Sequence, residues 1–248
     1  MRNVVAGEWA KAWSGKAWWM PAFFGILMSL MASLGYATQG HESIPQGQTD
    51  AGAVTDDVVQ AWMMMLLFAS LYGAVSVARE YSTGTIARSV LLSGSRMRLF
   101  SAKLIVTTAM GALYGVLAAG LAVASGWGLM VSSADQDPVF TRETWLIVLG
   151  IFVCNTLSAP WGLFIGWIVR NQIAAVGTLM GFTLLLDPGL QALFPQGAKY
   201  LMTIAMSSVY RDGKPELLSE PLALLVIAGW LAAAALLARK LLTSRDVV

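Results

Sequence analysis

Apolar runs long enough to cross a membrane recur along this chain, and they constrain its fold more than any other feature. A transmembrane helix needs about 20 predominantly apolar residues to cross the hydrocarbon core of a bilayer. Because a backbone in lipid must satisfy its own hydrogen bonds, each run is expected to be helical. The six predicted spans are Trp18–Tyr36, Val58–Ala78, Leu104–Trp127, Trp145–Val169, Ile173–Phe194 and Pro221–Ala238.

The composition is that of a membrane protein. Of the 248 residues, 57% are hydrophobic and 12% are charged, whereas soluble domains have about 25% charged residues. The single cysteine, Cys154, lies inside an apolar run and has no disulfide partner. The predicted fold class is therefore an all-α membrane protein with six transmembrane helices, which form one domain over residues 1–248.

The distribution of charge predicts the orientation. Six spans place both termini on one side of the membrane, and most of the 16 Lys and Arg residues fall on that side. The exceptions are Arg142, Lys199, Arg211 and Lys214. Because Lys and Arg in short loops stay on the cytoplasmic side, both termini are predicted to be cytoplasmic in the cell membrane. The net charge of +2 is accounted for by this asymmetry, so no nucleic-acid partner is expected.

The N-terminal stretch GEWAKAWSGKAWW, residues 7–19, alternates tryptophans with lysines. This pattern is typical of a short helix in the membrane interface, which we predict over residues 1–17. A basic start followed by an apolar run would also fit a signal peptide. Tryptophans before and at the start of the run disfavour that alternative.

The loops on the side away from the termini differ in length. The Gly-, Gln- and Asp-rich stretch GHESIPQGQTDAGAVTDD, residues 40–57, predicts a flexible connector. A second region, residues 187–220, is predicted to be re-entrant or loop structure.

No enzyme signature occurs in the chain. An intramembrane hydrolase would need a nucleophile with a base or a metal motif such as H-E-x-x-H, and neither occurs. The phosphate loop G-x-x-x-x-G-K-[ST] is also missing, so the chain is not expected to hydrolyse ATP itself. The only histidine, His41, lies in a predicted loop without a second ligand nearby, and no metal site is predicted.

Few polar residues fall within the predicted spans. Asp187 is the only ionisable one, and with Pro188 and Gly189 it predicts the end of the fifth helix and a short outer helix through Leu193. A role in substrate passage is the alternative. Asn155 and Ser158 in the fourth span suit helix-to-helix hydrogen bonds or the lining of a pathway.

The segment REYSTGTIARSVLLSGSR, residues 79–96, lies between the second and third spans. Gly84 breaks the preceding helix, and Thr85 is placed to cap a short new one. Ile86, Val90 and Leu91 are predicted to share a face, and Ser93-Gly94-Ser95 stops the helix. The alternative is a surface loop whose arginines set topology and bind anionic headgroups.

This segment resembles the E-x-x-x-G-T pattern between spans two and three of type-2 ATP-binding-cassette exporter permeases. The matching residues are Glu80, Gly84, Thr85, Arg88, Leu91, Ser95, Arg96, Lys103 and Leu104. The resemblance extends along the chain. It includes the Trp-rich N-terminal helix, the turn Val169-Arg170-Asn171-Gln172 between spans four and five, Pro195–Tyr200, and the C-terminal Ser244-Arg245-Asp246.

The resemblance implies that the segment is a coupling helix that docks on a separate ATPase chain. The residues that it assigns to this joint, within a coupling segment over residues 79–101, are Arg79, Glu80, Gly84, Thr85, Arg88 and Arg96. It implies a dimer of cytosolic ATPase subunits that binds ATP and Mg, and a second permease subunit that is either an identical copy or a similar paralogue. Asn155, Ser158 and Asp187 are candidates for the path of a hydrophobic drug, peptide antibiotic or lipid. The rival functions are an ATP-independent secondary transporter and a membrane scaffold or sensor.

Overall fold

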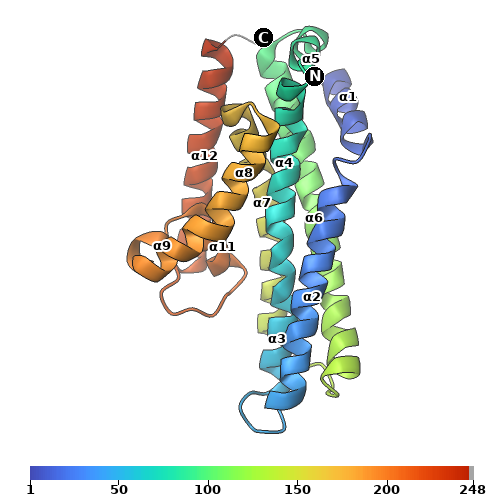
Figure 1. The fold of residues 1–248 in the computed structure, drawn as a ribbon, viewed down its shortest axis with the longest axis vertical. Helices are drawn as coiled ribbons and strands as arrows, with labels where there is room; N and C mark the ends of the chain where they lie inside the picture. Colours follow the sequence, from blue (N-terminus) through green and yellow to red (C-terminus); the bar gives the residue numbers. More distant parts are fainter. Residues whose placement is uncertain (246–248) are drawn as a thin grey trace.

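A computed structural model describes residues 1–245 as an elongated bundle of helices (Figure 1). Every regular element within the described residues is helical. Six helical stretches are long and apolar enough to cross a membrane, which confirms the predicted number of spans. Asp246, the last residue of the C-terminal motif, lies outside the described residues.

The elements follow one another with short connections. In chain order they are α1 (Arg2–Trp13), α2 (Trp19–Ser43), α3 (Ala51–Gln60), the 3₁₀ turn η1 (Ala61–Met64), α4 (Met65–Ser82), α5 (Ile86–Ser93), α6 (Arg96–Ser133), α7 (Arg142–Val169), α8 (Gln172–Gly181), the π turn η2 (Phe182–Leu186), α9 (Asp187–Leu193), α10 (Pro195–Ala198), α11 (Met202–Val209) and α12 (Glu220–Ser244). The second span consists of α3, η1 and α4, and the fifth of α8, η2 and α9.

Helices α4, α6 and α7 form the centre of the bundle. A Cβ atom added at Gly73 of α4 would lie 1.9 Å from the carbonyl oxygen of Ala159, and one added at Gly162 of α7 would lie 1.8 Å from that of Ser70. A Cβ atom at Gly111 of α6 would lie 2.7 Å from the Cβ of Ala159. Only glycine permits such close approach of backbones, so these small residues fix the packing within the protomer.

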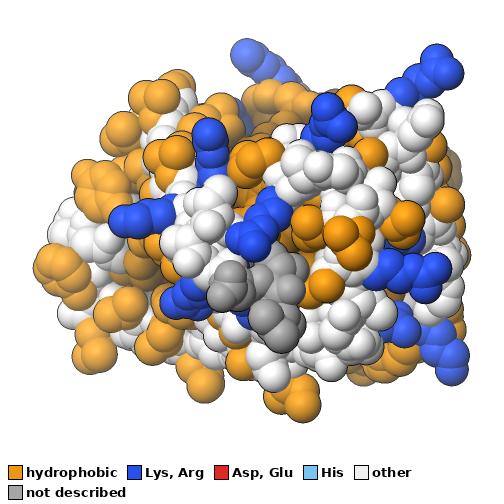
Figure 2. All heavy atoms as spheres, turned by 90° about the horizontal axis from the view of Figure 1, so that it is seen from above, with side chains coloured by type: hydrophobic (Ala, Val, Ile, Leu, Met, Phe, Trp, Pro, Cys, Tyr) orange, Lys and Arg blue, Asp and Glu red, His pale blue; other side chains and the backbone are white. Residues whose placement is uncertain are grey.

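Both termini lie at the same end of the molecule, together with α5 (Figure 1). Seen from that end, Lys and Arg side chains project around the face, and no described Asp or Glu side chain is visible (Figure 2). Phe23, Phe24 and Leu27 of α2 are exposed on the side of the bundle. An apolar exterior with a basic end is the surface that a membrane protein needs.

The prediction of a flexible connector over residues 40–57 is wrong for most of that stretch. Helix α2 continues to Ser43, and α3 begins at Ala51 after the carboxylate of Asp50 accepts a hydrogen bond of 2.8 Å from the amide of Ala53. Val54 and Val58 are buried against α2 and α6. The connector is reduced to residues 44–50, because this buried face stabilises a helix that polar composition alone does not predict.

The fifth span also differs from the prediction. A short helix through Leu193 is present, but the chain does not leave the helical path at Asp187. The amide of Asp187 instead donates to the carbonyl of Phe182 in the π turn η2. This wider turn accommodates Pro188, which has no amide hydrogen to donate. Helix α9 lies at the side of the bundle, away from α2 and α6 (Figure 1).

Candidate functional site

Helix α5 is bounded by two glycines in the left-handed conformation. Gly84 has φ +68° and Gly94 has φ +75°. These residues turn the chain out of α4 and back into α6, as glycine does where other residues are strained. The predicted start and end of this short helix are therefore confirmed.

Thr85 occupies the N-cap position of α5, but its side chain does not cap the helix. Its hydroxyl oxygen lies 2.9 Å from that of Thr83, whose hydroxyl also lies 2.9 Å from the carbonyl oxygen of Arg79. The predicted capping role is wrong because Thr85 has nearly helical backbone angles, with φ −82° and ψ −8°. An N-cap side chain reaches the amides of the first turn from an extended backbone.

One face of α5 packs inward and the other is apolar and exposed. Ile86, Ser89 and Ser93 are buried, whereas the side chains of Leu91 and Leu92 are 82% and 75% exposed. The prediction that Leu91 shares the buried face of Ile86 is wrong, because five residues correspond to about 140° of further rotation around a helix.

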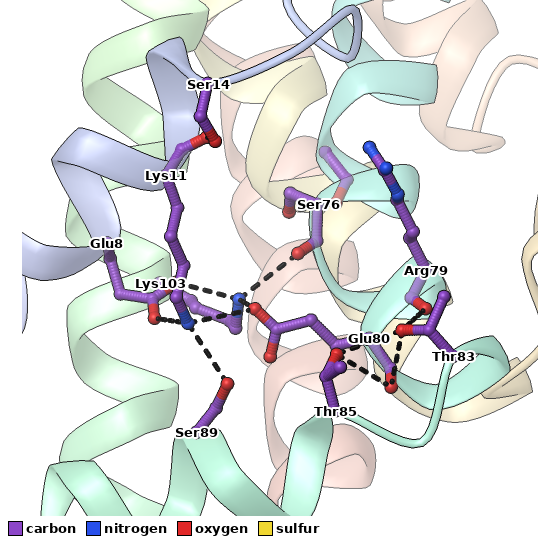
Figure 3. Close-up of polar contacts among 11 residues, drawn as sticks. Glu8, Lys11, Ser14, Ser76, Arg79, Glu80, Thr83, Thr85, Ser89 and Lys103 are labelled. Carbon is purple, nitrogen blue, oxygen red and sulfur yellow. Dashed lines mark hydrogen bonds and ion pairs between the residues drawn. The ribbon is translucent and has the colours of Figure 1, made fainter.

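Four charged side chains form a closed network next to α5 (Figure 3). We call Glu8, Lys11, Glu80 and Lys103 the charge network. The Lys103 ammonium lies 2.8 Å from Oε2 of Glu8 and 2.8 Å from Oε1 of Glu80. The Lys11 ammonium lies 2.7 Å from Oε1 of Glu8 and 3.2 Å from Oε1 of Glu80. Each cation therefore pairs with both carboxylates.

Lys103 is the buried centre of the charge network. Its side chain is 3% exposed, and its third donor reaches the carbonyl oxygen of Ser76 at 3.1 Å. An ammonium group has three hydrogens to donate, so all three are used. Two lysines and two glutamates leave the network neutral, which is what allows charges to be buried.

Lys11 extends the charge network to α5. Its ammonium donates to the hydroxyl oxygen of Ser89 at 3.0 Å. Burial lowers the pKa of Lys11, but the hydrogen bond to Glu8 and the negative charges of Glu80 and Glu8 raise that pKa above its ordinary value. The network thus joins α1, α4, α5 and α6 through direct side-chain contacts.

The other residues predicted for the joint take different positions. Arg79 and Arg88 are exposed, and neither forms an ion pair with another described residue. Arg96 donates to the carbonyl oxygens of Leu242 at 2.9 Å and Arg245 at 3.1 Å. Arg96 therefore caps the C-terminal end of α12, where a positive charge favours the helix dipole.

Asn155, Ser158 and Asp187 are all buried within the protomer. Asn155 and Ser158 donate to carbonyl oxygens of their own helix, at 2.8 Å each, and Ser158 also contacts the sulfur of Met206 on α11 at 3.5 Å. The carboxylate of Asp187 accepts a hydrogen bond from the hydroxyl of Thr203, also on α11. The amide oxygen of Asn155 is buried and accepts no hydrogen bond from the described residues. The role of all three residues in a substrate path stays a prediction.

Glu8 and Lys11 are not predicted as site residues from the sequence, and Lys103 is predicted only as part of a motif. Two signals could have found them. Glu8 and Lys11 are three residues apart on a predicted helix, where side chains meet, and Lys103 precedes an apolar run directly. Neither signal shows that Glu8 and Lys103 meet across the bundle.

The chain matches the model of the family described as ABC-2 family transporter protein over residues 4–186. The chain belongs to this family. The match covers about three quarters of the chain and includes the charge network, α5 and the glycines on either side of it. This protein is thus a permease of an ATP-binding-cassette transporter. No curated protein matches the chain.

Proposed function

We propose that this permease is the membrane subunit of an exporter that is driven by separate ATPase subunits. Membership of the ABC-2 family supports an ATPase partner, and ATP and Mg are bound by that partner. The basic end of the molecule faces the cytoplasm, so both termini and α5 lie where an ATPase can reach them. The cargo is a hydrophobic drug, peptide antibiotic or lipid.

Helix α5 is the coupling helix in this proposal. The observation that supports this role is that one face of α5 contacts the charge network while the opposite face is apolar and exposed. The inner face rests on the charge network through Ser89, while Leu91 and Leu92 point outward. Exposed apolar side chains at a basic, water-facing end mark a protein contact better than a topogenic loop. Arg88, exposed on the same short helix, adds a charge that an acidic partner surface would match.

The charge network then transmits the movement of α5 to the spans. A push on α5 displaces Ser89, and Lys11 and Lys103 cannot separate from their carboxylates without leaving a buried charge unpaired. Helices α1, α4 and α6 therefore move with α5 as one body. Rigid-body displacement of this kind is a common form of switching.

A second permease copy completes the path between the two subunits. Gly177 and Gly181 of α8 form a G-x-x-x-G pair, and a Cβ atom added at either would meet nothing within 4 Å in this protomer. Such pairs let helices approach closely in lipid. The face of α8 with these glycines is therefore the proposed contact with the partner copy, and Asp187 follows it toward the outer end of the span.

Affinity purification from the native membrane tests the docking role. The wild-type chain is expected to retain a protein that carries the phosphate-loop sequence G-x-x-x-x-G-K-[ST]. The double variant Leu91→Ala/Leu92→Ala should lose that protein. Leu193→Ala is the matched control, because Leu193 is equally exposed but lies on α9. Capture of no such ATPase, or transport by the purified chain alone, would favour the secondary transporter or the scaffold instead.

A further inference from the structure

A cleft of about 410 Å³ opens beside the charge network, between α1, α4 and α6. It extends along α4 from Tyr72 to Glu80 and is bounded on the other side by Thr107 of α6 and the connection from Ser14 to Ala17. Its volume is sufficient for a lipid headgroup or a small organic ligand.

Arg79 gives this cleft an unmatched positive charge. The negative charges of Glu8 and Glu80 are offset by Lys11 and Lys103 within the charge network. Arg79 also lines the cleft, but among residues 1–245 no side chain forms an ion pair or a hydrogen bond with its guanidinium. In Figure 3 this side chain extends away from the carboxylate of Glu80.

Two hydroxyl groups line the cleft, that of Tyr72 on α4 and that of Thr107 on α6. Tyr72 lies seven residues before Arg79, so both lie on one face of α4, and helical side chains point toward the N-terminus of their helix. Thr107 lies opposite on α6. No hydrogen bond joins either hydroxyl to another residue in the described part of the chain. The cleft therefore offers a guanidinium and two hydroxyl donors without partners.

The cleft lies beside a cluster of tryptophans. The rings of Trp9 and Trp13 are 5.9 Å apart, and those of Trp13 and Trp18 are 5.0 Å apart. Trp9 and Trp13 are exposed on α1, which contributes Lys11 and Ala12 to the cleft. Exposed tryptophans gather at the level of lipid headgroups. The ligand at this depth is therefore a lipid rather than a solute of the cytosol.

We propose that the cleft binds the headgroup of an anionic phospholipid, with its phosphate paired to Arg79 and hydrogen-bonded by Tyr72 and Thr107. A guanidinium suits a phosphate because it offers two parallel donors. Basic pockets between helices at the cytoplasmic side are the kind of site that anionic headgroups occupy. The bound lipid would contact α1 and α4 next to the charge network, and so stabilise the position of α1.

Native mass spectrometry of the full chain in detergent tests this site with phosphatidylglycerol as the probe. The wild type is expected to retain phosphatidylglycerol in preference to phosphatidylcholine. Arg79→Ala should weaken retention about tenfold, which corresponds to about 1.4 kcal/mol for the lost ion pair, and Arg79→Lys should recover part of it. Arg88→Ala is the matched control, because Arg88 is exposed at the same end but does not line the cleft.

If Arg79→Ala and Arg88→Ala retain phosphatidylglycerol equally, Arg79 does not bind the lipid and the proposed site is wrong. Equal retention of phosphatidylcholine and phosphatidylglycerol would overturn its preference for anionic lipid. Displacement of the lipid by an equal concentration of glycerol 3-phosphate would show a site for soluble phosphates and overturn the lipid assignment. The measurement needs no ATPase, so a result against the lipid site would leave the proposed coupling role of α5 unaffected.

Discussion

Two ionic clusters lie in different parts of this permease, and they differ in burial. The charge network joins α1, α4 and α6, and the side chains of Lys103 and Glu8 are 3% and 8% exposed. The second cluster pairs Arg211, in the loop after α11, with Glu143 of α7 and Glu220 of α12. There the side chains of Arg211 and Glu143 are 26% and 48% exposed.

This difference in burial decides what each cluster can do. Water solvates the charges around Arg211 whether or not they are paired, so their separation costs little. The buried charges of the network have no such alternative, and separating them leaves a charge uncompensated. The exposed cluster around Arg211 therefore suits a loop that opens, and the buried charge network suits a joint that must move as one body.

Loss of Lys103 should have the largest effect. Lys103→Met leaves Glu8 and Glu80 side by side with only Lys11 between them, and we expect a loss of about 3–5 kcal/mol in the free energy of unfolding. Thermal unfolding in detergent measures it. Lys240→Met on the exposed end of α12 is the control and should unfold as the wild type does. An unchanged Tm for Lys103→Met would show that the charge network does not stabilise the bundle.

Removal of Glu8 as well should restore part of this loss. In Glu8→Gln/Lys103→Met one of the two stranded carboxylates is gone, and Lys11 remains to pair with Glu80. We expect the double variant to be more stable than Lys103→Met by about 1–3 kcal/mol. The same thermal measurement, completed with Glu8→Gln alone, gives the coupling energy of the pair. Additive losses would contradict direct contact between Glu8 and Lys103.

Loss of the bond to Asp187 should have an intermediate and local effect. Thr203→Val leaves a buried carboxylate without its donor, which costs about 1–3 kcal/mol. Because α9 packs mainly against its neighbours η2 and α10, hydrogen exchange should increase in α9 and α10 but not in α6. Thr178→Val is the control, since Thr178 donates only to its own helix. Unchanged exchange would show that packing alone holds α9.

The exposed cluster should give the smallest effect. Arg211→Gln removes ion pairs with Glu143 and Glu220 that water screens, so we expect a loss of about 1 kcal/mol or less. High salt should shrink even this difference, because exposed charges are screened beyond about 10 Å at 0.1 M ionic strength. Thermal unfolding at low and high salt measures both. A loss as large as that of Lys103→Met would overturn the comparison between the clusters.

Local signals in the sequence predict much of this fold. The apolar runs give the number and type of the spans, and Gly84 and Ser93-Gly94-Ser95 give the ends of α5, because turn residues act on their immediate neighbours. Helix α3 escapes prediction, since its buried valines pack against α2 and α6. The π turn before Pro188 is also missed, because proline in a helical run signals an end more often than a widened turn.

The candidate site is predicted only in part. Glu80 and Gly84 stand in a motif, and the sequence places both near the joint. The pairing of Glu8 with Lys103 depends on how α1 folds back on α6, which is a tertiary contact between residues far apart in the chain. Arg96 is assigned to the joint because it adjoins α5, but its side chain turns instead to the end of α12.

The central claim is that α5 transmits ATP-driven motion to the spans, and a matched pair of glycines tests it. Gly84 and Gly213 both have φ +68° and open space around them, but only Gly84 adjoins α5. Valine at either position is strained by about 1–2 kcal/mol, so both variants should share the same loss of stability.

The measurement is hydrogen exchange of the permease–ATPase complex with and without ATP. In the wild type and in Gly213→Val, ATP should change exchange at the ends of α1, α4 and α6 that meet the charge network. In Gly84→Val this change should vanish, either with the ATPase still bound or because docking is lost. A Gly84→Val complex that shows the full ATP-dependent change would contradict the account.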